Sequence, residues 1–110
     1  MKIKIPTLRG SNYRESWERL GENVYNALGD ALSDAADTDN GEICALYAPV
    51  VAWLLAQERA NYFGTNWRGW NYNNLFTTLE RALVVAEREG YPKWLEDGVK
   101  EAEEVLRRIR

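Results

Sequence analysis

Apolar residues recur every three or four positions along four stretches of this chain, and that spacing constrains the fold more than any other feature. An interval of three or four places side chains on one side of an α-helix. At the start of the first stretch, Asn12 and Glu15 have the spacing of an N-terminal capping box. We therefore predict a helix over residues 12–36, with one apolar side made of Tyr13, Trp17, Leu20, Val24, Leu28, Ala31 and Ala35.

Two glycines lie inside this first predicted helix. Gly21 and Gly29 each cost a helix interior ~1 kcal/mol relative to alanine. A glycine removes the side chain and lets another element come close to the backbone. We expect either that another helix approaches closely at these positions or that the helix breaks near Gly29.

A turn and a second helix follow. The composition of residues 37–41, Asp-Thr-Asp-Asn-Gly, predicts a turn, and Asp39 with Glu42 repeats the capping-box spacing. Apolar side chains then occur on nearly every side of a predicted helix over residues 40–63, so we expect it to be the most buried helix. Pro49 removes one backbone hydrogen bond inside it, which predicts a kink or a restart.

The second half of the chain predicts two more helices. Residues 64–73 are rich in Gly and Asn without periodicity, which indicates a loop. Apolar spacing predicts a helix over residues 74–89, ended by Gly90 and Pro92, and a last helix over residues 92–109. Four helices in one chain of 110 residues predict a single all-α domain folded as an antiparallel four-helix bundle.

The N-terminus has a different pattern. Lys2-Ile3-Lys4-Ile5 alternates charged and apolar residues, as a strand does, and Pro6 ends the alternation. We predict a short extended arm over residues 1–10. A single strand has no partner in an all-helical chain, so the arm must lie on the bundle or pair with the same segment of a second copy.

The composition excludes most of the familiar catalytic and metal-binding chemistries. The chain has no histidine and a single cysteine, Cys44, which removes His-based nucleophilic systems and the usual zinc and iron-sulfur sites. No phosphate-binding glycine loop is present. We expect no enzyme activity, no cofactor and no metal. A lone cysteine among apolar neighbours is more often a packing residue than a reactive one.

The location of the protein follows from the same kind of argument. No stretch of the chain approaches the ~18 consecutive apolar residues that a membrane-spanning helix needs. The N-terminal residues are too polar for a secretion signal, and one cysteine cannot form an internal disulfide. We therefore expect a cytoplasmic protein that does not enter a membrane.

One end of the predicted bundle gathers basic and aromatic residues. If chain direction alternates, the start of the first helix, the end of the last helix and the loop before the third helix meet there. The opposite end would be acidic, from Asp30 through the turn at Asp39, with few cations. The candidate binding residues at the basic end are Lys2, Lys4, Arg9, Trp67, Arg68, Trp70, Tyr72, Arg107 and Arg108.

Three interpretations of that basic, aromatic end remain open. Its aromatic side chains can simply cover the end of the core, because large aromatics are usually well buried. They can form a protein interface, since Trp, Tyr and Arg are enriched at binding hot spots. They can also bind single-stranded nucleic acid, although a formal net charge of −3 weakens that alternative. The working hypothesis is a non-enzymatic interaction module that forms homo-oligomers through the arm and the aromatic loop.

Overall fold

The computed structural model describes the backbone of residues 13–61 and 70–110, and the side chains of residues 24–60 and 70–110. The predicted arm lies outside these residues. Within them the chain is helical and contains no strand, as the all-α prediction requires. The elements are the helices α1 (Tyr13–Asp37), α2 (Gly41–Asn61), α3 (Tyr72–Glu89) and α4 (Glu96–Ile109), with a short 3-10 turn, η1 (Lys93–Leu95), before α4.

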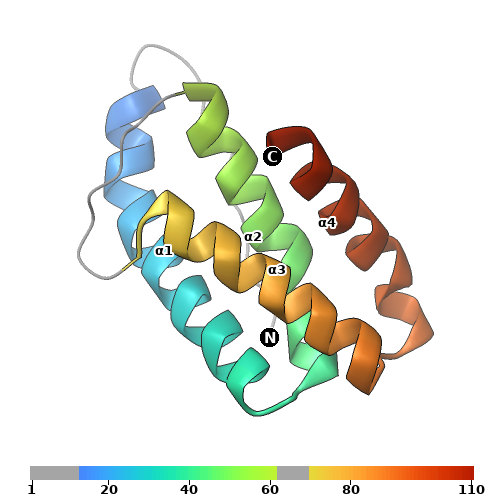
Figure 1. Cartoon of the computed structure of the whole chain (residues 1–110). Coiled ribbons are helices and arrows are strands. Elements are labelled where there is room, and N and C mark those ends of the chain that lie inside the picture. Colours follow the sequence, from blue (N-terminus) through green and yellow to red (C-terminus); the bar gives the residue numbers. More distant parts are fainter. Residues whose placement is uncertain (1–12, 62–69) are drawn as a thin grey trace.

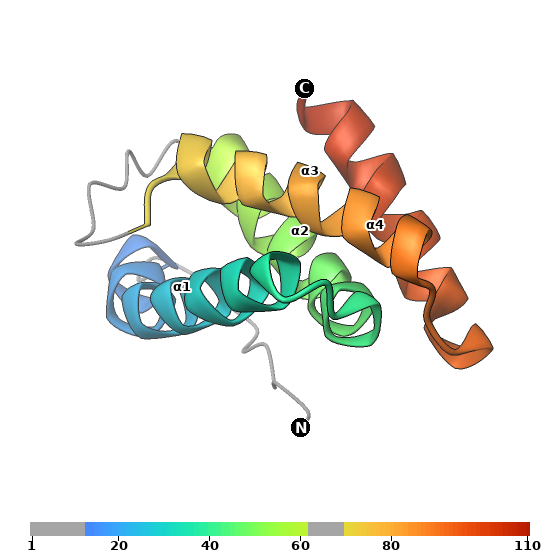
Figure 2. The same cartoon turned by 60° about the horizontal axis from the view of Figure 1, so that its bottom comes forward.

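The four helices alternate in direction but do not form a square bundle. Figure 1 shows α2 in the centre, α1 and α4 on its two sides, and α3 across the front. Figure 2 shows that α1 and α4 lie on opposite sides of the molecule. The chief packing partners of α2 are α3 and α4, and α1 packs on α2 and α3. The prediction that the second helix is the most enclosed one is confirmed, since none of residues 43–58 is exposed.

Close contact between α2 and α4 explains this arrangement. These two helices would be diagonal neighbours in a square up-and-down bundle. Gly98 of α4 lies directly against Pro49 of α2, and a Cβ atom at residue 98 would come within 3.2 Å of the proline ring. The absence of a side chain at Gly98 therefore lets α4 pack directly on α2. Of the kink or restart predicted at Pro49, the restart does not occur, because α2 is one helix from Gly41 to Asn61.

The apolar side of α1 is turned relative to its prediction. Tyr25 and Leu32 are fully buried, whereas Val24 and Ala31, which the prediction placed on the apolar side, are only partly buried. Both sets fit a spacing of three and four residues around Leu28, so periodicity alone could not separate them. The hydroxyl of Tyr25 donates a hydrogen bond of 2.7 Å to Glu58 of α2, which is also buried. This polar pair lies between α1 and α2.

The turn between α1 and α2 differs from its prediction by one residue. Asp39 has a positive φ of 55° and ends α1, with the N–H of Asn40 donating to the carbonyl oxygen of Ala35 at 2.8 Å. This is the Schellman arrangement. The side chain of Asn40, rather than that of Asp39, accepts the N–H of Ile43 at 3.1 Å. Asn40 is thus the N-cap of α2 and the predicted capping box is wrong.

The two helices of the second half also begin at other residues than predicted. Asn71 caps α3 by accepting the N–H of Asn74 at 2.8 Å, so Tyr72 belongs to the helix and not to the loop. Gly90 ends α3 as predicted, with a positive φ of 87°. After Pro92 the chain forms η1 before it enters α4, so the fourth α-helix begins later than the sequence indicates.

Candidate functional site

The nine candidate binding residues are divided between described and undescribed parts of the chain. Trp70 and Tyr72 lie at the start of α3, and Arg107 and Arg108 lie in the last turn of α4. The remaining five, Lys2, Lys4, Arg9, Trp67 and Arg68, fall outside the described residues.

Trp70 is held against α1. Its indole ring covers Gly29, where a Cβ atom would lie 2.6 Å from the ring atoms. The indole Nε1–H donates to a carboxylate oxygen of Asp30 at 2.9 Å, and the backbone N–H of Trp70 donates to the side-chain oxygen of Asn26 at 3.3 Å. The close approach expected at Gly29 therefore occurs, but its partner is an indole ring rather than another helix.

The bond between Trp70 and Asp30 corrects the predicted separation of charge. The sequence placed these two residues at opposite ends of the bundle, yet they are in direct contact. The reason is that the chain returns beside residues 26–30 of α1 before α3 begins. The other end of the molecule is not poor in cations either, because Arg81 pairs with Asp37 and Arg88 pairs with Asp39.

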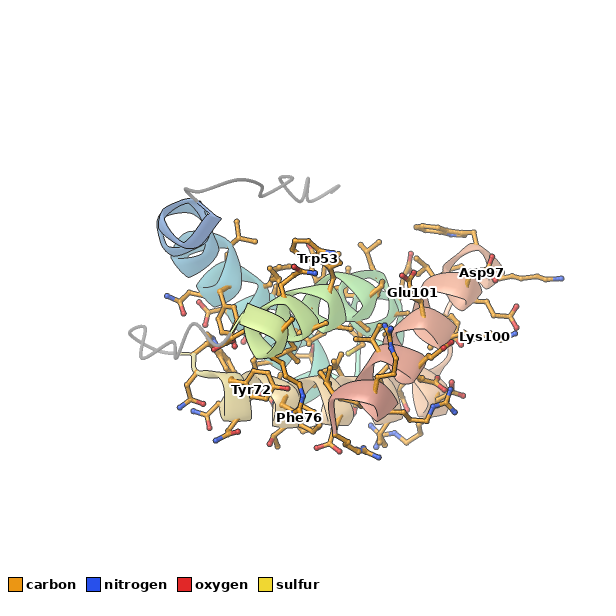
Figure 3. The ribbon with its side chains drawn as sticks, turned by 90° about the horizontal axis from the view of Figure 1, so that it is seen from above. Trp53, Tyr72, Phe76, Asp97, Lys100 and Glu101 are labelled. Atoms are coloured by element: carbon orange, nitrogen blue, oxygen red, sulfur yellow. The ribbon has the colours of Figure 1, made fainter. Side chains whose placement is uncertain are left out.

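Tyr72 is the second aromatic candidate. It is half-buried, and its ring lies 6.1 Å from that of Phe76, with an angle of 31° between the ring planes. Its hydroxyl is buried and has no hydrogen-bond partner among the described residues. Figure 3 shows both rings on α3. Trp70 and Tyr72 thus contribute to packing, in agreement with the interpretation of this region as a cover on the core.

Arg107 belongs to a different surface from Trp70. It lines an open groove of about 660 Å³ between α3 and α4, whereas Trp70 lines a groove of about 550 Å³ between α1 and α3. No described contact joins these two residues. The α3–α4 groove has an apolar floor of Leu83, Val84 and Leu106 and a rim of Glu80, Glu87, Arg88, Glu103, Arg107 and Arg110.

Two carboxyl groups face each other across the α3–α4 groove. Burial raises the pKa of Glu103, and a hydrogen bond with Glu87 and the charge of Glu87 raise it further. Burial, followed by the charges of Glu87 and Glu103, also raises the pKa of Tyr91. About two helical turns farther along the groove, Arg110 at the end of α4 pairs with Glu80 of α3. The charges in this groove therefore largely compensate one another.

Cys44 and the acidic turn have structural roles. Cys44 is fully buried, and this burial raises the pKa of its thiol, so the thiol stays protonated at neutral pH. In the part of the chain that the structure describes, no three Cys, Asp or Glu side chains are placed to hold one metal ion. The carboxylates of the turn instead pair with arginines of α3.

A further surface, not predicted from the sequence, lies on the side of α2 away from α3. Figure 3 shows Trp53 of α2 on this side, opposite Tyr72 and Phe76, with Glu101 on the near side of α4 and Asp97 at the far edge of that helix. Leu46 and Val50 share the face of Trp53 because they precede it by seven and three residues. All three apolar side chains are only half-buried. We call this surface the outer face, made of Leu46, Val50, Trp53, Asp97 and Glu101, and we include Trp94 because it lies four residues before Gly98, which packs on Pro49 of α2.

Trp94 is the most exposed large apolar side chain among the described residues. It is 70% exposed, and Val84 of α3 follows at 61%. Trp94 lies four residues before Gly98, and Trp53 lies four residues after Pro49, so the two tryptophans flank the contact between α4 and α2. Asp97 and Glu101 are exposed, and neither forms an ion pair with a described residue.

The sequence did contain a signal for the outer face. An α-helix that is apolar on nearly every side needs neighbours on every side, and three other helices in this arrangement leave one side of α2 open. No described helix is long and apolar enough to cross a lipid bilayer. Comparisons with protein-family models, with curated proteins and with solved structures find no match to this chain.

Proposed function

We propose that the protein is a non-enzymatic helical interaction module that self-associates, with the outer face as its contact surface. The observation that carries this proposal is the exposure of Trp94, which is 70% accessible although it lies in an ordered turn of the chain. Tryptophan is the residue type most enriched at binding hot spots. A buried, unoxidised Cys44 suits a reducing compartment such as the cytoplasm.

Three features of the outer face support a protein partner. Its centre is apolar, with Leu46, Val50 and Trp53 half-buried in a row along α2. Its α4 edge is acidic, through Asp97 and Glu101. An apolar centre beside a polar rim is the usual anatomy of a protein interface, and identical patches on two copies can pair around a twofold axis.

Sedimentation of the intact protein over a range of concentrations tests this proposal. We expect a reversible increase in mass with concentration. Trp94→Ala should weaken the association at least about tenfold, as loss of a hot-spot side chain does.

Val84→Ala is the matched control, because Val84 is also exposed but lies on α3. It should leave the association unchanged. A monomeric mass at every concentration would reject self-association, and an equal effect of both variants would place the contact elsewhere.

The alternative, binding of single-stranded nucleic acid, has less support from the described residues. The two described aromatic candidates, Trp70 and Tyr72, are packed against the protein, and Arg81, Arg88 and Arg110 pair with carboxylates. Titration of a labelled single strand at low salt distinguishes the alternatives. Tight binding that falls steeply with added salt would favour the nucleic-acid function.

A further inference from the structure

We propose that residues 1–9 of the same chain bind the outer face and compete there with a second copy of the protein. This inference rests on the proposed function, because it names a second occupant for the same surface. The two occupants would exclude each other. Self-association would then require the arm to leave.

The composition of the arm matches the outer face. Ile3, Ile5 and Leu8 supply apolar side chains, and Lys2, Lys4 and Arg9 supply positive charge. If the alternating segment Lys2-Ile3-Lys4-Ile5 binds in an extended conformation, its isoleucines and lysines would lie on opposite sides of the backbone. The isoleucines can thus contact Leu46, Val50 and Trp53, while the long lysine side chains extend sideways to the carboxylates at the edge of the outer face.

The charges on the two surfaces are opposite in sign. Asp97 and Glu101 are exposed at the α4 edge of the outer face, and Glu42 lies one turn before Leu46 on α2. Among the described residues, none of these three carboxylates is ion-paired. Exposed ion pairs contribute little stability, on the order of 0–1 kcal/mol each, so the arm is held mainly by its apolar side chains.

The length of the arm and its point of attachment fit binding within one chain. The start of α1 and the end of α2 lie at the same end of the molecule, so the arm joins the protein near one end of the outer face. Twelve extended residues span at most roughly 40 Å. The distance along α2 from Asn61 to Leu46 is only about 22 Å at the rise of an α-helix.

Attachment to the same chain also favours the arm over a free competitor. A tethered segment acts at an effective concentration on the order of millimolar. Weak contacts by a few isoleucines and lysines are then enough to occupy the surface for much of the time. A second copy at ordinary concentration must compete with this local excess.

Disulfide trapping in a Cys44→Ala background tests the position of the arm. The variant carrying Lys4→Cys with Glu101→Cys should form an intramolecular disulfide at low protein concentration. The matched control carries Lys4→Cys with Val84→Cys, whose second position is equally exposed but lies on α3. We expect the control to cross-link at least about tenfold more slowly, because its effective concentration is lower. Equal rates for both pairs, or disulfides between chains only, would overturn the proposal.

Removal of residues 1–9 tests the competition. If the arm covers the outer face nine-tenths of the time, its deletion should tighten self-association about a hundredfold, because both copies must be uncovered and only about one-tenth of each is. Weaker or unchanged association after deletion would contradict competition by the arm. If the intact and the shortened chains are both monomeric, the proposed function fails, whereas the trapping result still decides whether the arm binds the face.

Discussion

The two faces of α2 have nearly the same composition but different surroundings. The inner face, made of Cys44, Ala48, Val51 and Leu55, is fully buried toward α3. The outer face keeps Leu46, Val50 and Trp53 half-exposed. Apolar composition therefore explains why α2 is central, but it does not say which side is covered by this chain. The inner face stabilises the fold, and the outer face is available to a partner.

The largest expected effect is the difference in stability between two leucine-to-alanine variants, one on the inner face and one on the outer face of α2. Leu55→Ala should lower the free energy of unfolding by about 3 kcal/mol, because it leaves a cavity in a closed core. Leu46→Ala should lower it by about 1 kcal/mol, since its side chain is only partly buried. Urea denaturation of both variants measures the difference. Equal losses would mean that the two faces are equally enclosed.

The second prediction concerns how α3 is held over the inner face. Gly29→Ala places a methyl group against the indole ring of Trp70, which must move. Overpacking of this kind costs ~1–3 kcal/mol, and the better helix propensity of alanine offsets about 1 kcal/mol of it. We expect a net loss of about 0–2 kcal/mol, together with a red shift of the tryptophan emission as Trp70 moves away from α1.

Ala27→Gly is a useful control for that variant, because Ala27 is exposed on the same helix. It should cost only the ~1 kcal/mol of glycine in a helix and leave the fluorescence of Trp70 unchanged. A stabilised Gly29→Ala variant would show that the indole does not need the glycine.

The third prediction concerns the buried hydrogen bond between α1 and α2. Tyr25→Phe removes the hydroxyl that donates to the buried carboxylate of Glu58. We expect a loss of about 1–3 kcal/mol in the free energy of unfolding, because a buried acceptor loses one of its hydrogen-bond donors. Thermal and urea unfolding measure it. A loss below about 0.3 kcal/mol would indicate that other partners of Glu58 fully compensate for the hydroxyl.

The smallest effect is expected at the α3–α4 groove. Burial and Glu87 raise the pKa of Glu103, so the folded state favours its protonated form. The stabilisation that protonated Glu103 gives the folded state is fully present below the ordinary pKa of glutamate. It is lost as the pH rises through the raised pKa of Glu103 in the folded protein. The free energy of unfolding of Glu103→Gln, compared with that of the parent protein, should therefore increase as the pH rises from about 4 to about 7. Urea unfolding at several pH values measures the trend.

Local spacing was enough to predict the four helices. The ends of α3 and α4 differed by only a few residues, because caps such as Asn71 and the 3-10 turn depend on geometry that spacing does not contain. The buried side of α1 was predicted less well, since Tyr25 and Leu32 fit the helical period as well as Val24 and Ala31 do. Periodicity identifies a helix more reliably than it identifies its core side.

Contacts between distant residues could not be predicted from the sequence. Gly29 indicated a close approach, but nothing in the chain identified Trp70 as the partner. The predicted basic end assumed only that chain direction alternates, which does not determine which helices pack side by side. The contact of Gly98 with Pro49 instead brings α4 against α2, and Trp70 returns to α1 beside Asp30. Two contacts of this kind were enough to separate Trp70 from Arg107.

The indole N–H signals of the tryptophans offer the most direct measurement, in nitrogen-15 correlation spectra recorded at increasing protein concentration. Substitutions of Trp53, Trp70 and Trp94 by phenylalanine assign the signals. If the outer face is the contact surface, the signals of Trp53 and Trp94 should shift with concentration, while that of Trp70, bonded to Asp30, should stay in place. Signals of Trp53 and Trp94 that do not move while the mass of the protein increases would contradict the account.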